Sequence, residues 1–426
     1  MKRTYVHYVL TLALLVLTTF FLNIPYVAYG AFLFVGFYLL NKRRDFSYFI
    51  PLIVLSPFIS SNASDTLIYF YIYIGLLGVL LIFDFYKYRK ARRFGSLGLG
   101  LFFLFDAAAL SLFNAEQLLL GLQGLLLLGI IFLLYLYFVN TIDATKPFII
   151  KLSFVFMISA WVLFIQQVSL ALMDATSFLE ATISLAWAQW YEYPFIYVMV
   201  IPLGALFTLK SRYLYFTMMT WLIAFIGLLL SAHIPSIFSG LVVMIGMLIY
   251  FYRNEKSYFK TISYMLAGLV LLPLLLDLTI PTASFTRMLL MVMDIPSAWS
   301  RFISTIIKSY ELVLSHPILG RGGLYHMAIL LDGDITSLDF QNLFFKTMSM
   351  GTLGFLAFMY LQYRKIRLIL ESEKELRITV FSILIVALLV QGIFTAIYYH
   401  PLFLVSIFLW MSVVESDAKQ RRLKSR

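Results

Sequence analysis

No cysteine occurs among the 426 residues of this chain, which excludes a disulfide framework and any metal site built on thiolates. Charged residues are scarce as well. They make up 12% of the chain, whereas soluble proteins usually carry about 25%. A chain with so few charges is not expected to be a soluble globular protein.

Hydrophobic residues make up 62% of the chain and aromatic residues 18%. Apolar runs of roughly 18 or more residues recur from end to end, and each is long enough to cross ~30 Å of hydrocarbon. We therefore predict an all-α, polytopic integral membrane protein with about 14 transmembrane helices (12 at the fewest). The first run follows Met1-Lys2-Arg3 and lacks a small-residue cleavage site, so it is expected to be the first span rather than a removed signal.

The predicted spans lie near residues 5–22, 24–40, 47–60, 67–85, 95–113, 117–138, 147–171, 193–209, 213–231, 236–252, 261–280, 343–361, 377–397 and 400–414. Basic clusters fall in alternate loops, at residues 42–44, 87–93, 210–212, 253–256, 363–367 and 419–426. The positive-inside rule assigns these loops and both termini to the cytoplasm. The basic residues behind the net charge of +11 thus serve to orient the chain in a bacterial cytoplasmic (inner) membrane. No nucleic-acid partner is expected.

This orientation divides the chain into three parts. Residues 1–280 form a transmembrane bundle of about eleven spans. Residues 281–342 form an extracytoplasmic loop, and residues 343–426 form transmembrane hairpins with a basic cytoplasmic tail. Long connections of this kind tend to carry function. Four of the five histidines also fall at the outer surface, which favours chemistry or polar-ligand binding there: His233, His316, His326 and His400.

The outer loop contains an amphipathic helix at residues 298–314, "AWSRFISTIIKSYELVL". Its apolar residues recur at three- and four-residue intervals, while Arg301 lies on the opposite, polar face. Pro317 and Gly320 end it. The helix is expected to lie along the outer membrane interface or to pack over the spans.

Arg287, Arg301 and Arg321 are the candidate ligands for a phosphate group in this loop. A guanidinium can grip two phosphate oxygens at once and stays charged at every relevant pH. Three arginines in one short extracytoplasmic stretch predict a site for a lipid-linked phosphate. Farther along, Gly351 and Gly354 are expected to let helices approach closely within the bilayer.

These parts together resemble the bacterial O-antigen polymerase and ligase family. The resemblance rests on Arg301, then "SHPILGRGG" (315–323), then "FQNLFF" (340–345), then "MGTLGF" (350–355), in this order and on one side of the membrane. It implies a metal-independent glycosyltransferase, without a cofactor, acting on undecaprenyl-pyrophosphate-linked sugars at the outer leaflet. Pro317 and the glycines Gly320 and Gly322, with His316, would form a tight turn that lets the backbone approach the pyrophosphate beside Arg321.

Two departures from the family pattern leave the general base open. Gln341-Asn342 stands where the family often has His-Asn, and glutamine cannot act as a base. Upstream, "LLLSAHIPSIFSG" (228–240) lacks the arginine that many members carry after a span. His326, Asp339 and His233 remain the candidates for the base.

The loss of the family's first histidine favours a polymerase of polysaccharide repeat units over the alternative, an O-antigen ligase that transfers glycan to a lipid A core. The expected partners are lipid-linked oligosaccharides and membrane lipids, with a chain-length regulator as a candidate. A flippase for the same lipid is a further alternative, but no basic residue lies at the centre of a predicted span. Asp106 is the one clear charge there, and we interpret it as a neutral, hydrogen-bonded carboxyl packed between helices.

Overall fold

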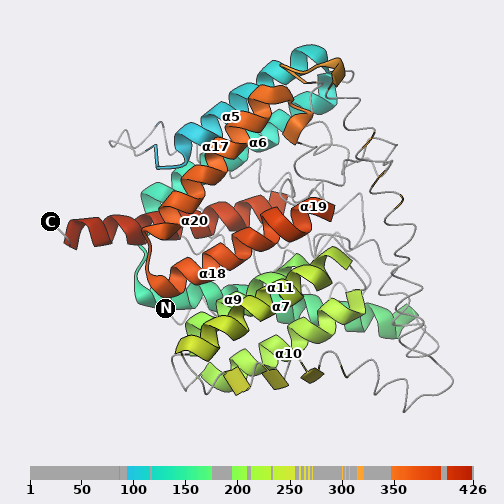
Figure 1. Cartoon of the computed structure of the whole chain (residues 1–426), viewed down its shortest axis with the longest axis vertical. Helices are drawn as coiled ribbons and strands as arrows, with labels where there is room; N and C mark the ends of the chain where they lie inside the picture. Colours follow the sequence, from blue (N-terminus) through green and yellow to red (C-terminus); the bar gives the residue numbers. More distant parts are fainter. Residues whose placement is uncertain are drawn as a thin grey trace.

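The computed structural model describes residues 94–115, 118–174, 194–208, 213–231, 234–254, 314–320, 347–394 and 401–424, with isolated positions at 86, 259–260, 263–264, 267–268, 271, 300, 303 and 307. Within these residues 90% are helical and none lies in a strand, so the all-α prediction is confirmed for this part of the chain. Figure 1 shows the helices running side by side.

The helices have the following bounds: α5 Gly98–Ser111, α6 Leu118–Thr141, α7 Lys146–Asp174, α9 Phe195–Thr208, α10 Leu214–Ser231, α11 Ile234–Asn254, α17 Gly351–Leu370, α18 Lys374–Ile385, α19 Gly392–Phe394 and α20 Pro401–Lys424. A 3₁₀ turn, η3 (Leu112–Asn114), follows α5, and a π-helical turn, η5 (Val386–Gln391), follows α18. Among the residues that the structure describes, three stretches are long and apolar enough to cross a membrane: Gly124–Thr141, Lys146–Ile165 and Pro235–Arg253. They support a membrane protein.

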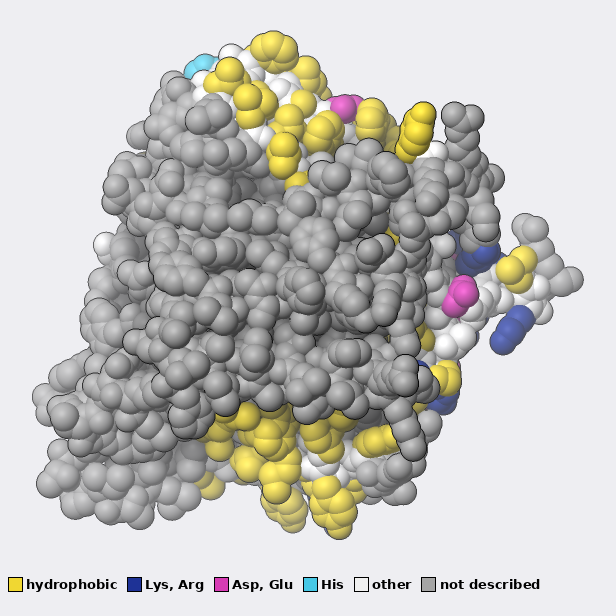
Figure 2. Space-filling view, turned by 180° about the vertical axis from the view of Figure 1, so that it is seen from behind, with side chains coloured by type: hydrophobic (Ala, Val, Ile, Leu, Met, Phe, Trp, Pro, Cys, Tyr) yellow, Lys and Arg dark blue, Asp and Glu magenta, His cyan; other side chains and the backbone are white. Residues whose placement is uncertain are grey.

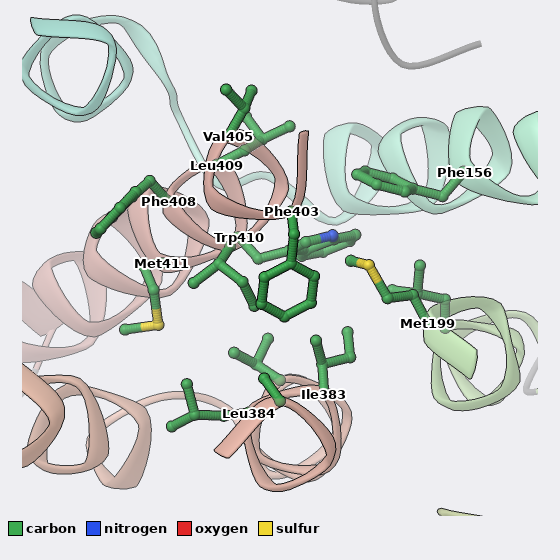
Figure 3. Packing of buried hydrophobic residues seen from close by; sticks show 14 of the residues in the cluster. Phe156, Met199, Ile383, Leu384, Phe403, Val405, Phe408, Leu409, Trp410 and Met411 are labelled. Atoms are coloured by element: carbon green, nitrogen blue, oxygen red, sulfur yellow. The ribbon is translucent and has the colours of Figure 1, made fainter. Parts of the chain in front are cut away.

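Helix α20 lies at the centre of the described bundle. Every residue from 403 to 414 is buried, and a helix that is hydrophobic all round has to be enclosed by other helices. It packs against α6, α17 and α18. Trp410 lies 5.8 Å, centroid to centroid, from the Phe156 ring of α7, and Figure 3 shows Met199 of α9 on the same side.

The buried stretch of α20 ends in Glu415, which holds the start of α5 and the last third of α6. Its Oε1 accepts hydrogen bonds from the Ser96 backbone N–H (2.8 Å) and hydroxyl (3.1 Å). Its Oε2 accepts the Tyr135 hydroxyl at 2.8 Å, and the Tyr135 oxygen in turn accepts the Leu97 N–H at 3.0 Å. One carboxylate therefore joins three helices.

The next two residues of α20 hold two further loops. The Ser416 hydroxyl oxygen accepts the Ala144 backbone N–H, in the connection between α6 and α7, at 2.9 Å. Asp417 accepts the Glu373 N–H, at the start of α18, at 2.8 Å. We call this end of the bundle, defined by Ser96, Ala144, Glu373 and residues 415–417, the charged end. In Figure 2, dark-blue Lys and Arg side chains gather on one side of the molecule.

Helix α17 differs from its prediction at both ends. It begins at Gly351 rather than near 343, and it continues through the basic residues 363–367, which were expected in a loop. Arginine and lysine are good helix formers, so a basic cluster does not end a helix. Arg364 donates its Nε–H to the Ser96 carbonyl oxygen at 3.2 Å, at the charged end. Lys365 is fully buried, with Nζ 5.0 Å from the centroid of the Phe408 ring.

Candidate functional site

The turn at residues 316–320, His-Pro-Ile-Leu-Gly, lies at the other end of the bundle. The Gly320 backbone N–H closes the turn by donating to the His316 carbonyl oxygen at 3.0 Å. Gly320 has a φ of 69°, a left-handed conformation that glycine adopts without strain. Leu314 and Ser315, just before it, are helical, and the chain leaves the helical conformation at His316, directly before Pro317.

This turn caps helix α17. The first N–H groups of a helix have no partner within the helix, and Met350, at the N-cap position, offers no side-chain hydrogen bond. The Pro317 carbonyl oxygen supplies one, because it accepts both the backbone N–H and the hydroxyl of Thr352, at 2.9 Å and 2.5 Å. Residues 35 positions apart in the sequence are thereby joined.

Two glycines allow the turn and the helix to approach backbone to backbone. A Cβ on Gly320 would lie 2.1 Å from the Ser349 carbonyl oxygen, and a Cβ on Gly351 would lie 2.1 Å from the Ile318 carbonyl oxygen. Gly351 also has a left-handed φ, of 74°. Neither position has room for a side chain.

Asn114 joins a third segment to this site. It lies in η3, after α5, and its Nδ2 donates to the Gly320 carbonyl oxygen at 3.1 Å. That carbonyl belongs to the peptide group that leads into Arg321. Gly320, the last described residue of the turn, is therefore held by a side chain from η3. We call Asn114, residues 316–320 and Gly351 the turn end.

The surface of the turn end is apolar beside one histidine. His316 is half-buried, with Nδ1 3.1 Å from the Ser315 hydroxyl oxygen. Leu314 and Ile318 are 61% and 63% exposed. Ser300, Ile303 and Ile307, described positions of the predicted amphipathic helix, are also exposed, and the two isoleucines fall on the same face as Leu314 at helical spacing. An exposed apolar face of this kind fits the expected contact with a membrane interface.

The structure describes three of the predicted site residues, His316, Pro317 and Gly320, and places them together in the turn. The other candidates lie outside the described residues: Arg287, Arg301, Arg321, Gly322, His233, His326, Asp339, Gln341 and Asn342. Within the described ranges, no group of three or more histidines and carboxylates is arranged to hold a metal ion.

The prediction for Gly351 and Gly354 was wrong. Gly351 meets the 318–320 turn instead of a second helix, and a Cβ on Gly354 would meet Met350, in the residues just before α17. Close helix approaches occur at other glycines, for example at Gly100 of α5, where a Cβ would lie 3.0 Å from the Leu361 side chain of α17. A pair of small residues marks a tight approach but does not say which segment approaches.

Asn114 and Thr352 are site residues that the sequence pattern did not reveal. Asn114 looks like an ordinary loop residue between two apolar runs, and Thr352 lies inside a motif whose glycines drew attention first. One sequence feature could have indicated them. Residue 350, the N-cap position of a helix that starts at Gly351, is not a Ser, Thr, Asp or Asn, the usual N-cap residues. Such a helix needs its cap from elsewhere.

Helix α11 begins at Ile234, within the upstream "LLLSAHIPSIFSG" segment, and its Ser236 and Ser239 are fully buried. Gln391 of η5 donates its Nε2–H to the Ser236 hydroxyl oxygen at 2.7 Å. The π-helical turn carries one extra residue per turn and brings Gln391 onto the same buried face as Val386. This bond joins α11 to the end of α18, inside the bundle.

No protein-family model matches this chain, and no curated protein sequence matches it significantly.

Proposed function

We propose that this protein is a polymerase that joins undecaprenyl-pyrophosphate-linked oligosaccharide repeat units into a surface polysaccharide. It would work at the outer face of a bacterial cytoplasmic membrane, with both termini in the cytoplasm. The long apolar helices support the membrane part of this proposal. The reaction rests on the resemblance to the O-antigen polymerase and ligase family.

The observation that carries the proposal is the contact between the two glycine-bearing motifs on which the resemblance rests. "HPILG" and "MGTLG" lie about thirty residues apart, yet Pro317 caps α17 and Gly320 packs on Gly351. Two motifs with no shared role would have no reason to lie in contact. Their contact supports one site, on the opposite end of the bundle from the Glu415 network.

In the proposed reaction the acceptor hydroxyl attacks the anomeric carbon of the donor sugar, which is the growing glycan on its lipid. The new C–O bond forms as the bond to pyrophosphate breaks, and lipid pyrophosphate leaves with the electron pair. Arg301, Arg321 and Arg287 stabilise the charge that develops on this leaving group. One of His326, Asp339 and His233 takes the hydroxyl proton.

Arg321 comes directly after the turn end in the sequence, and Asn114 holds the carbonyl of Gly320, the residue before it. A guanidinium that grips two phosphate oxygens is effective only where its approach is restricted.

A reconstituted assay tests the proposal. Purified protein in lipid bilayers is given lipid-linked repeat units, without nucleotide sugars or added metal, and the products are separated on a gel. A ladder of polymer lengths that persists in a chelator is the expected result. Arg301→Ala should abolish the ladder, while Arg367→Ala, an exposed residue of α17 (61% side-chain exposure), should not. A requirement for nucleotide sugar would overturn the proposal.

A deletion strain separates polymerase from ligase. Loss of a polymerase leaves a single repeat unit on the lipid A core, whereas loss of a ligase leaves none. A flippase predicts instead that lipid-linked repeats accumulate on the cytoplasmic side. The buried Lys365 does not favour the flippase, because its neighbour Arg364 is bonded at the charged end rather than at mid-bundle.

A further inference from the structure

The last part of helix α20 is basic and extends past the charged end. In Figure 1 it projects beyond the helices beside it, towards the C-terminus. The helix continues to Lys424, and its four cationic side chains in this part are exposed: Lys419, Arg421, Arg422 and Lys424. No acidic residue occurs in the sequence after Asp417. A positively charged helix end therefore projects from the bundle.

Two of these cations hold the helix end in place. Arg421 lies 3.5 Å from Glu373, between its Nη2 and the carboxylate Oε1, and Arg422 pairs with Glu371. Both carboxylates belong to the connection between α17 and α18. The two arginines thus tie one side of the helix end to that connection.

The opposite side of the helix end carries Lys419, Leu423 and Lys424. Helical spacing of about 100° per residue places these three within about 140° of one another, on the side away from Arg421 and Arg422. Leu423 is 63% exposed and lies between the two lysines on this side. We call Lys419, Leu423 and Lys424 the tail face.

Contacts within the bundle set the depth of the tail face in a membrane. Ser416 accepts the backbone N–H of Ala144, in the connection between the apolar stretches Gly124–Thr141 and Lys146–Ile165. If these two stretches cross the membrane, Ser416 lies at the edge of the hydrocarbon. Residues 419–424 then lie about 4–12 Å farther along the helix, whereas the headgroup layer is about 5–7 Å thick. Lysine side chains are long enough to reach back into that layer.

Charge limits what binds the tail face. The other loops predicted on this side carry basic clusters, at residues 42–44, 87–93 and 210–212, so they repel the two lysines. A second copy of the chain would bring the same positive charge. The phosphate groups of anionic lipids have the opposite charge and lie at the right depth, and the acyl chains beneath them accept an apolar side chain such as Leu423.

We propose that the tail face binds anionic phospholipids in the leaflet at the charged end. The ammonium groups of Lys419 and Lys424 pair with lipid phosphates, and Leu423 inserts between the lipids. The paired arginines keep this face turned towards the lipid. The proposal does not depend on the reaction that the protein catalyses.

Fluorescence quenching tests which lipid lies beside the tail face. Gln420→Cys, between the two lysines, supplies the single cysteine of a chain that has none, and it carries a fluorophore. The full chain is placed in phosphatidylcholine bilayers that contain either brominated phosphatidylglycerol or brominated phosphatidylcholine, and bromine quenches only a fluorophore nearby. Phosphatidylglycerol should quench at a lower mole fraction. Lys419→Gln and Lys424→Gln should each reduce this preference about fivefold.

Two controls separate lipid binding from a general effect of charge. Lys419→Arg keeps the cation and should keep the preference. Arg253→Gln removes an exposed cation from the end of another helix, α11, and should leave the preference unchanged. High salt should weaken the preference, because it screens exposed charges.

Three results would each overturn the proposal. The first is equal quenching by the two lipids, which is expected if the lysines serve an acidic protein instead. The second is an unchanged preference in both lysine-to-glutamine variants. The third is an equal loss in Arg253→Gln.

Discussion

Gly320 and Gly351 carry the strictest steric requirements of the turn end. Both have a left-handed φ, and for both a Cβ would lie 2.1 Å from a backbone oxygen that cannot move aside like a flexible side chain. Alanine at a left-handed position costs about 1–2 kcal/mol before any clash is counted. The contact itself therefore depends on both glycines.

We expect Gly320→Ala and Gly351→Ala each to lower the unfolding temperature of the purified protein and to reduce polymer formation. Gly246→Ala in α11 is the matched control. A Cβ there meets nothing within 4 Å, and alanine in a helix is worth about 0.5–1 kcal/mol over glycine. Thermal unfolding in detergent measures all three. Equal stability of Gly320→Ala and Gly246→Ala would contradict the packing seen at the turn end.

Arg301 provides the second prediction at the scale of a residue, and it rests on the proposed function. If the Arg301 guanidinium binds two pyrophosphate oxygens at once, Arg301→Lys should reduce polymer formation nearly as much as Arg301→Ala. Loss of one such electrostatic stabiliser costs about 2.7–4 kcal/mol, or about a hundred- to a thousand-fold in rate. Polymer length in cells, at matched protein levels, is the measurement. Wild-type ladders from Arg301→Lys would remove Arg301 from the site.

At the scale of an element, α20 combines two roles along one helix. Its first half is enclosed by other helices, and its Glu415-Ser416-Asp417 segment holds three connections. Polar groups at the edge of an apolar bundle need defined partners, because an unsatisfied one costs more than a mutual bond contributes. The segment therefore fixes the positions of α5, α6, α7 and α18 relative to one another along the bundle.

A double-mutant cycle measures this role. Glu415→Gln and Tyr135→Phe are combined, and the coupling between them is expected to be about 0.5–3 kcal/mol, because they share a hydrogen bond of 2.8 Å. Chemical unfolding of each variant supplies the free energies. The same cycle between Glu415→Gln and Lys419→Ala, an exposed residue of α20, should give a coupling near zero. Similar values from the two cycles would show that Glu415 does not bond Tyr135.

At the scale of the whole molecule, the two ends of the bundle differ in chemistry. The charged end carries the carboxylates and arginines of α17, α18 and α20. The turn end carries His316, exposed apolar side chains and the two packed glycines. The positive-inside rule predicts that the charged end faces the cytoplasm and that the turn end faces the outside.

Cysteine labelling tests this assignment. Ile318→Cys, 63% exposed at the turn end, should react with an impermeant thiol reagent added to intact cells. Lys374→Cys, exposed at the charged end, should react only after the membrane is opened. Ser372 is a poor probe for the same loop because it is 1% exposed, and a cysteine there would be unreactive on either side. The reverse pattern would place the turn end in the cytoplasm.

The sequence alone determined the features that arise from neighbouring residues. Apolar runs predicted helices, and those in the described residues, such as α6 and α7, begin and end within a few residues of expectation. Pro317 and Gly320 predicted the end of the amphipathic helix, because a fixed φ and a left-handed glycine act locally. Most described helix ends were therefore accessible from the pattern, apart from those of α17 and the C-terminal end of α20, which runs to Lys424 rather than to residue 414.

The tertiary structure decided what depends on residues far apart in the chain. Local patterns did not reveal that Pro317 caps α17, that Asn114 holds Gly320, or that the basic cluster at 363–367 continues a helix and buries Lys365. Each of these follows from which surfaces meet when the bundle forms, since a helix terminus or a buried charge takes whatever partner the packing brings to it. Asp106 belongs to the same class: its type was evident from the sequence, but it lies half-buried on the exposed apolar side of α5 rather than between helices, where it was predicted, because other helices cover the remaining sides.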